Sequence, residues 1–269
     1  MPVHPAQTQL VSSDNSVTIT DVRFPSRSIK GTLSYRAILP TVKPGERLPV
    51  LYLLHGANSD PLEVQRLSDV VHLAISSRLI VVMPEAGYSY YTNARLRPYS
   101  HWEDAISGEL VHNVDSNFPA LTDREHRGIA GISMGGYGAV KLAFKHPELY
   151  AFVGSMSGAL DITTRPASFR RWSQTWRIWT IFGIRRCTRQ DEDVFTLLGK
   201  TNNPQNIQWF VSCGKADPLY AVNARFLRRL QERQVAVNSS MTSTGGHDWQ
   251  SWNKAMPQLF KTASERLYH

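Results

Sequence analysis

Five short, nearly continuous apolar runs constrain the fold of this chain more than any other feature of its sequence. They lie at residues 49–54, 79–83, 128–132, 151–156 and 207–213. Runs of this length are typical of strands that are covered on both faces, as in a parallel sheet. Helix-like stretches separate them, at residues 62–76, 101–117, 135–145 and 221–234. This alternation predicts βαβ units and therefore an α/β fold with a doubly wound sheet.

The two ends of the chain extend this arrangement. Residues 17–24 and 29–39 alternate between apolar and polar side chains, which predicts an antiparallel hairpin. Residues 235–241 predict a last strand, which a Gly-Gly loop separates from a closing helix. Residues 1–15 are polar and lack periodicity, so we expect a loose N-terminal arm there. A single domain at 16–269 is expected to follow, with a mostly parallel sheet of about eight strands.

Composition narrows the classes of protein to which the chain can belong. Of its 269 residues, 42% are hydrophobic and 19% are charged, as in an ordinary globular protein with a full core. No apolar run approaches the length that spans a bilayer, and the first residues lack a secretory-signal pattern, so we expect a cytoplasmic location. Cys187 and Cys213 are too few for a disulfide framework and lack metal-binding spacing.

The net charge of +8 is concentrated in one segment of the chain. Residues 162–190 contain seven arginines and no aspartate, glutamate or lysine. Any electropositive site is therefore expected to be local. No recognition motif accompanies the basic segment, and we expect no nucleic-acid partner.

Ser133 is the candidate nucleophile. It is the central residue of Gly131-Ile132-Ser133-Met134-Gly135, which fits the G-x-S-x-G pattern of a sharp strand-to-helix turn. An apolar strand run ends just before Ser133, and a helical pattern follows until Pro147. The order of strand, turn and helix is the one that the α/β-hydrolase fold requires, and it predicts a serine hydroxyl lifted above the sheet.

The candidate base follows by elimination, because the order along the chain in this fold is serine, then acid, then histidine. Seven of the nine histidines precede Ser133 or lie on the helix that follows it: 4, 55, 72, 101, 112, 126 and 146. His269 is the last residue, where order is usually lost. His247 follows a predicted strand and the Gly245-Gly246 pair, which can bring the loop close to the serine. The elimination therefore favours His247.

Asp217 is the favoured acid among several carboxylates between the serine and the histidine. It follows the apolar run 207–213 and lies at the carboxyl end of a strand, where sites collect. The alternative is that Asp217 only caps the helix that Pro218 begins. Asp161, after the preceding strand, is the runner-up. Asp248 is adjacent to His247 and is poorly placed to align the imidazole ring.

Backbone N–H groups are expected to form an oxyanion hole. The residue after the serine, Met134, supplies one donor, and Ala57, in the turn after the strand at 49–54, is the candidate for the other. His55 is expected to be a packed loop residue. The set predicts attack of Ser133 on an ester carbonyl of a small-molecule substrate and an acyl-enzyme that water hydrolyses, with no metal or organic cofactor.

The chain resembles the esterase D family, which includes S-formylglutathione hydrolases, tributyrin-type and feruloyl esterases, and the mycolyltransferase antigens. The residues that carry the likeness lie at 51–56, 129–139, 157–161, 213–217 and 245–252. The family roles fall on Ser133, Asp217 and His247, with Ala57 and Met134 as oxyanion donors. The ending His-Asp-Trp-x-x-Trp is most similar to the tributyrin-esterase branch. The formylglutathione hydrolases favour a histidine where this chain has Tyr137.

A segment within 162–200 shows no family pattern, and three interpretations of it stay open. Its aromatic residues recur at helical spacing, and most of the arginines lie off that stripe, which predicts an amphipathic helix. The aromatic residues, with the glycine that ends the stripe, are Phe169, Trp172, Trp176, Trp179 and Gly183. The helix is expected to pack its aromatic face on the body, to form a small cap over the substrate, or to contact a membrane surface or another subunit.

Three functions compete on the sequence alone. The leading hypothesis is a serine carboxylesterase that hydrolyses short-chain carboxylic esters. An acyltransferase or a thioesterase of the S-formylglutathione hydrolase kind would use the same triad, and a homo-oligomer stays open. A binding module that has the fold without activity is the more distant alternative, because fold does not guarantee activity.

Overall fold

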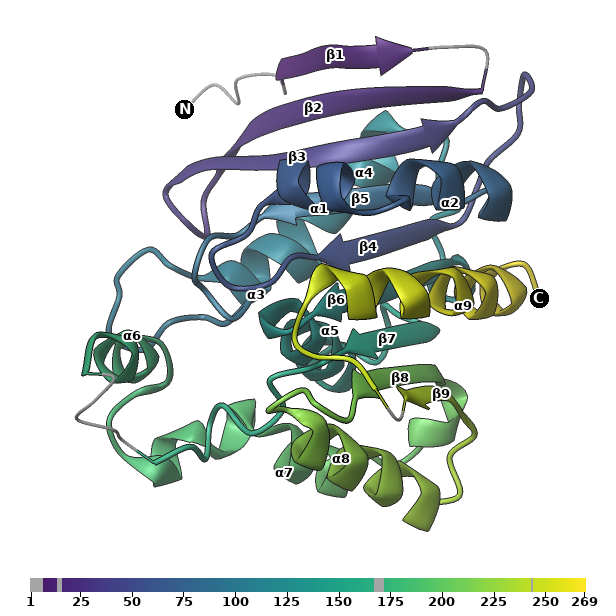
Figure 1. Cartoon of the computed structure of the whole chain (residues 1–269). Helices are drawn as coiled ribbons and strands as arrows, with labels where there is room; N and C mark the ends of the chain where they lie inside the picture. The colour runs from purple at the N-terminus through teal and green to yellow at the C-terminus, as the bar shows by residue number, and fades with distance from the viewer. Residues whose placement is uncertain (1–6, 14–15, 167–171, 243) are drawn as a thin grey trace.

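A single mixed sheet organises the molecule (Figure 1). The computed structural model describes residues 7–13, 16–166, 172–242 and 244–269. The strands of these residues are β1 (Gln7–Ser13), β2 (Val17–Ser26), β3 (Gly31–Pro40), β4 (Val50–Leu54), β5 (Ile80–Glu85), β6 (Arg127–Ile132), β7 (Phe152–Met156), β8 (Gln208–Gly214) and β9 (Val237–Thr242). Their order across the sheet is β1-β2-β3-β5-β4-β6-β7-β8-β9. In this order, the neighbouring pairs β1–β2, β2–β3 and β3–β5 are antiparallel. All the pairs that follow, from β5–β4 to β8–β9, are parallel.

Helices cover both faces of the sheet, as a doubly wound fold requires. They are α1 (Pro61–Leu67), α2 (Val70–Ser77), α3 (Trp102–Asp104), α4 (Val111–Asn117), α5 (Met134–Lys145), α6 (Trp172–Phe182), α7 (Val194–Lys200), α8 (Tyr220–Glu232) and α9 (Trp249–Leu267). Shorter turns of other helix types are η1 (Ala105–Leu110), η2 (Arg124–His126), η4 (Arg186–Glu192) and η5 (Pro204–Asn206). Helices α1, α2 and α9 share one apolar core with the sheet, while α4, α5, α7 and α8 share the other.

The predicted α/β class, the hairpin and the parallel strands are confirmed, and two local predictions are wrong. The helical stretch expected at 101–117 is also confirmed, and its middle is the π-helical stretch η1. The helix expected at 62–76 is two helices, because Ser68 takes an extended conformation between them. Residues 7–13 are not a loose arm but the edge strand β1. Backbone pairing with β2 holds them, and the Thr20 hydroxyl adds a hydrogen bond to the carbonyl of Gln9.

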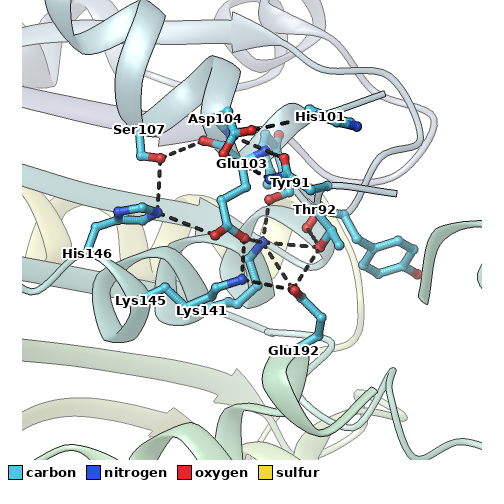
Figure 2. A network of polar contacts seen from close by, with 12 residues as sticks. Tyr91, Thr92, His101, Glu103, Asp104, Ser107, Lys141, Lys145, His146 and Glu192 are labelled. Atoms are coloured by element: carbon cyan, nitrogen blue, oxygen red, sulfur yellow. Dashed lines mark hydrogen bonds and ion pairs between the residues drawn. The ribbon is translucent and has the colours of Figure 1, made fainter. Parts of the chain in front are cut away.

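A buried ionic network fastens the surrounding chain to α5 (Figure 2). The Lys141 side chain is inaccessible to solvent, and its Nζ donates to Tyr91 O at 2.6 Å and to Glu103 Oε2 at 2.8 Å. Glu192 of η4 lies 3.4 Å from the same ammonium, and Lys145 bonds to both carboxylates. The network therefore joins the chain after β5, α3 and η4 to a single helix.

Charge balance within this network depends on the ionised form of Glu103. Burial by itself raises the pKa of Glu103, but the Lys141 ammonium and hydrogen bonds from His146, Lys141 and Lys145 outweigh it. The pKa of Glu103 consequently lies well below its usual range.

Replacing Lys141 with methionine is expected to lower the free energy of unfolding by about 3–5 kcal/mol, because two buried carboxylates lose a partner. Urea unfolding at neutral pH measures the change. Lys261→Met is the matched control, since Lys261 and Glu265 form an exposed pair worth about 0–1 kcal/mol. Equal stabilities of the two variants would contradict the prediction.

Acid should weaken the same network. Because the pKa of Glu103 is lower in the folded than in the unfolded chain, its ionised form stabilises the fold above an unfolded pKa of about 4.3. That contribution is lost as the pH falls further towards the folded pKa. The difference in the free energy of unfolding between the wild type and Lys141→Met is therefore expected to be largest at neutral pH and to become smaller below about pH 4.

Candidate active site

Ser133 occupies a strained turn between β6 and α5. Its backbone has φ 56° and ψ −110°, a conformation that non-glycine residues rarely adopt. A Cβ on Gly135 would lie 2.1 Å from the carbonyl oxygen of Leu54, and one on Gly131 would lie 2.3 Å from the backbone of Gly135. Only glycine fits at either position. The two glycines of the motif thus let α5 begin directly against the end of β4, with Ser133 at the apex.

His247 bridges Ser133 and Asp217. Its Nε2 lies 2.9 Å from Ser133 Oγ, and its Nδ1 lies 2.9 Å from Asp217 Oδ2. A close approach of two loops creates this alignment: a Cβ on Gly214, at the end of β8, would lie 2.2 Å from the carbonyl oxygen of Gly245. The three side chains come from loops after β6, β8 and β9. They form one hydrogen-bonded row at the carboxyl edge of the sheet.

Asp217 faces His247 and does not cap the next helix as the alternative interpretation expected, because the N-cap of α8 is Leu219 and has no side-chain cap. One carboxylate oxygen faces His247, while the other accepts the backbone N–H of Leu219 at 2.7 Å. The side chain is shielded from solvent. Burial raises the pKa of Asp217, but hydrogen bonds from His247, the Leu219 N–H and the Ser157 hydroxyl outweigh burial and keep the pKa below its usual value. The carboxylate is therefore ionised at neutral pH and able to orient an imidazole.

Ser157 and Trp252 support this row, and the sequence reasoning did not single them out. Trp252 Nε1 donates to Ser157 Oγ at 3.1 Å, and the Ser157 hydroxyl in turn bonds to Asp217. The Trp252 ring meets the His247 imidazole edge to face, with centroids 5.1 Å apart. The available signal was the repeated tryptophan after His247, which the first turn of α9 brings back over the imidazole.

The other candidate carboxylates have different partners. Asp161 forms an ion pair of 2.7 Å with Arg165. Asp248 caps α9 by accepting the N–H of Ser251 at 2.8 Å. Neither is recorded in contact with His247 within the described part of the chain.

His55 is a packed residue, as the sequence indicated. Its Nδ1 lies 2.7 Å from the carbonyl of Gly56, and its Nε2 accepts the N–H of Ala86 at 3.1 Å. Burial lowers its pKa, so the neutral ring is favoured. The Tyr91 hydroxyl also bonds to the His55 carbonyl at 2.9 Å. These contacts hold the turn that carries Ala57.

Two backbone N–H groups are available beside Ser133. Met134 is the first residue of α5, so its N–H has no acceptor within the helix and lies at the positive end of the helix dipole. Gly56 lies close to Ser133, since a Cβ on Gly56 would be 3.6 Å from the Ser133 Cβ. Ala57, the next residue, borders the same space. This arrangement can stabilise an oxyanion that forms on an attacked carbonyl.

Two hollows open on either side of Ser133. The smaller, about 170 Å³, is bordered by the turn after β4 and by Trp249 and Trp252. The larger, about 480 Å³, is bordered by Tyr88, Tyr90, Asp161, Arg165 and Gln174. Ser133 and His247 border both hollows. The site can therefore hold the two halves of a substrate on opposite sides of the serine.

The aromatic stripe expected within 162–200 is only partly buried. Ile181 and Phe182 pack into the core, and Phe182 meets Tyr90 and Tyr137. Trp176, expected on the packed face, is 55% exposed, because Ile181 and Phe182 occupy the side of α6 that faces the body. Phe169, Arg170 and Arg171 lie outside the described residues, and so does the side chain of Trp172.

Neither a membrane-spanning helix nor a cluster of metal ligands is found in the described residues. Among these, no helix has the length and apolarity needed to cross a membrane. In the same ranges, no group of three or more histidine, cysteine or acidic side chains is arranged to hold a metal ion.

Comparisons with known proteins agree with this architecture. The model of the Esterase family matches residues 26–263. An acetyl esterase of Caldicellulosiruptor saccharolyticus is 26% identical over 265 residues, which cover 93% of this chain and 99% of the relative. An esterase of Mycobacterium tuberculosis is 30% identical over 169 residues, 59% of this chain, and the match spans 35% of that longer protein.

Solved structures show the fold. The fluorophosphonate-binding serine hydrolase F of Staphylococcus aureus superposes with a TM-score of 0.81 at 24% identity, covering 93% of this chain and 99% of the other. An S-formylglutathione hydrolase of Agrobacterium tumefaciens gives a TM-score of 0.82 at 20% identity, covering 96% and 99%. At these identities the likeness establishes the α/β arrangement alone.

Proposed function

The chain belongs to the Esterase family and is a carboxylesterase, and from this premise we propose that it hydrolyses short-chain esters through an acyl-enzyme on Ser133. The observation that carries the proposal is the continuous row from Ser133 through His247 to Asp217, with both contacts at 2.9 Å. In this proposal Ser133 is the nucleophile, His247 the general base and Asp217 the group that orients the imidazole.

The proposed reaction has two halves that use the same groups. Ser133 Oγ attacks the ester carbonyl carbon while its proton passes to His247 Nε2, and the N–H groups of Ala57 and Met134 stabilise the oxyanion. The tetrahedral intermediate collapses, the bond to the alkoxy oxygen breaks, and His247 protonates the departing alcohol. Water then attacks the acyl-enzyme in the same way, and the carboxylic acid leaves from Ser133.

The two hollows suggest where each half of the substrate binds. We assign the acyl group to the smaller hollow, whose volume of about 170 Å³ and aromatic wall suit a short apolar chain. We assign the alcohol to the larger hollow, where Asp161 offers an acceptor and Arg165 and Gln174 offer donors. In this arrangement residues 162–200 act as a cap insertion within one domain at 16–269, because α6 contributes Gln174 to the wall.

A chain-length series of nitrophenyl esters tests this assignment. From butanoate to octanoate, kcat/KM is expected to fall at least about tenfold, because even one methylene that exceeds a pocket costs about 1–3 kcal/mol. Trp249→Ala opens the smaller hollow and should therefore reduce the ratio of kcat/KM for butanoate to kcat/KM for octanoate. Tyr88→Ala, which opens only the larger hollow, is the matched control and should keep the wild-type preference. A shift of acyl preference in the Tyr88 variant alone would reverse the assignment.

Acyl transfer is the second candidate function. The larger hollow beside Ser133 favours it, because an acceptor alcohol could bind there and replace water in the second half-reaction. Product analysis with a competing alcohol separates the two activities: a hydrolase yields mainly the acid, whereas a transferase yields mainly the new ester. The cytoplasmic location and a homo-oligomeric state stay predictions.

A further inference from the structure

Three large apolar side chains are exposed on α6 and on the chain beside its last turns. Trp176 is 55% exposed, Ile184 59% and Leu96 53%. The N–H of Leu96 donates to the carbonyl of Thr180 at 3.0 Å, so the loop that carries Leu96 runs alongside the last turns of α6. Figure 1 shows α6 standing away from the sheet, on the side toward which β4 points. The apolar side chains are therefore presented at an outward projection of the molecule.

Arginines surround these side chains. Arg95 and Arg185 are exposed, and the Arg95 side chain reaches within 3.3 Å of the position that a Cβ on Gly183 would take. Arg177 on α6 is exposed as well, whereas Arg165 pairs with Asp161 and Arg189 is buried. We call the surface made by Leu96, Trp176 and Ile184 with Arg95 and Arg185 the tip surface.

We propose that the tip surface docks on an anionic lipid membrane. Exposed tryptophan, leucine and isoleucine side chains enter the boundary between headgroups and acyl chains, and arginines beside them bind the headgroup phosphates. The two kinds of side chain are combined here on α6, on the residues that directly follow it and on the loop at 95–96 beside it. The apolar side chains supply apolar area to bury in the membrane, and the arginines supply attraction to anionic lipids. Interfacial binding depends on both contributions.

The charge of the tip surface argues against a second copy of the chain as the occupant. A two-fold contact would set the arginines of one copy against those of the other, because both copies present the same patch. A nucleic acid would pair with the arginines but would leave Leu96 and Ile184 facing solvent. An anionic bilayer matches both the charge and the apolar side chains.

Docking would bring the mouth of the larger hollow close to the membrane. Gln174 of α6 borders that hollow, and the Arg177 guanidinium lies over the ring of Tyr88, another lining residue, at 5.2 Å from its centroid. Membrane binding itself involves no reaction. It can therefore be measured independently of the proposed function.

The test is co-sedimentation of the full chain with vesicles, without substrate. Phosphatidylcholine vesicles containing one third phosphatidylglycerol are expected to retain the protein at low salt, whereas pure phosphatidylcholine vesicles are not. The double variant Arg95→Gln/Arg185→Gln should lower the partition coefficient about 25-fold, about fivefold for each arginine. Trp176→Ser/Ile184→Ser should lower it about tenfold or more.

Matched variants elsewhere on the surface separate a local effect from a general one. Arg228→Gln removes an exposed arginine of α8, and Leu62→Ser removes a leucine that is 58% exposed on α1. Both should bind like the wild type, and all of these variants should hydrolyse soluble nitrophenyl acetate at the wild-type rate. No retention of the wild type by anionic vesicles, or equal retention of tip and control variants, would overturn the proposal. Concentration-dependent self-association lost in Ile184→Ser, or DNA retention lost with the arginines, would overturn it in favour of another occupant.

Discussion

Replacing Ser133 with alanine is expected to lower kcat for nitrophenyl acetate by roughly 10⁶-fold, to the level left by the oxyanion donors and binding alone. The reason is that no other hydroxyl occupies the position 2.9 Å from His247 Nε2 in the described structure. The variant should still fold, because the substitution removes only an oxygen at the mouth of two hollows. Steady-state rates at saturating substrate, with circular dichroism as a check on folding, measure the effect.

Ser239→Ala is the matched control for this experiment. Ser239 is an exposed serine on β9, and the variant should keep the wild-type rate. An organophosphate should label the wild type and Ser239→Ala at a single site and should not label Ser133→Ala. If Ser133→Ala retained full activity, the proposed nucleophile would be wrong.

The second large effect is expected for Asp217→Asn, with a fall in kcat of about 10⁴-fold. An asparagine can still accept the Leu219 N–H, so the local turn is preserved. It carries no charge to stabilise the imidazolium, and its amide can hold His247 in the wrong tautomer. The loss should therefore appear in kcat, with little change in the melting temperature.

Asp161→Asn is the comparison that decides between the two carboxylates. Asp161 pairs with Arg165 and borders the larger hollow, so this variant should change KM by about tenfold or less and leave kcat nearly unchanged. If Asp161→Asn lost as much kcat as Asp217→Asn, Asp161 and not Asp217 would be assigned as the acid of the triad.

Local sequence patterns predicted the strands and most of the helices, because buried parallel strands need apolar runs and their boundaries need turn residues. The apolar pattern failed where backbone pairing with a neighbouring strand, and not the burial of alternating apolar side chains, holds a segment in place. Strand β1 has no apolar alternation, and the open edge of β2 holds it. Likewise, the π-helical stretch η1 has no signature that separates it from an α-helix in sequence.

The glycine motif indicated Ser133, chain order favoured His247, and a position at the end of a strand made Asp217 the favoured acid. The fold restricts which loops reach the carboxyl edge of the sheet, so order along the chain carries spatial information. The same reasoning left two interpretations of Asp217 open, and the structure favours the first: one oxygen faces His247 and the other accepts the Leu219 N–H within the loop, while Asp217 does not cap α8.

The order of strands and helices, the glycine turn at Ser133 and the choice of His247 all follow from the amino-acid sequence, because each depends on residues that are close in the chain or on their order along it. The remaining features depend on how distant elements pack. The Trp252–Ser157 contact joins residues 95 apart, and the Lys141–Glu192 pair joins residues 51 apart. The exposure of Trp176 depends on which side of α6 the body covers. Such contacts arise from packing between distant elements, and periodicity along the chain does not encode them.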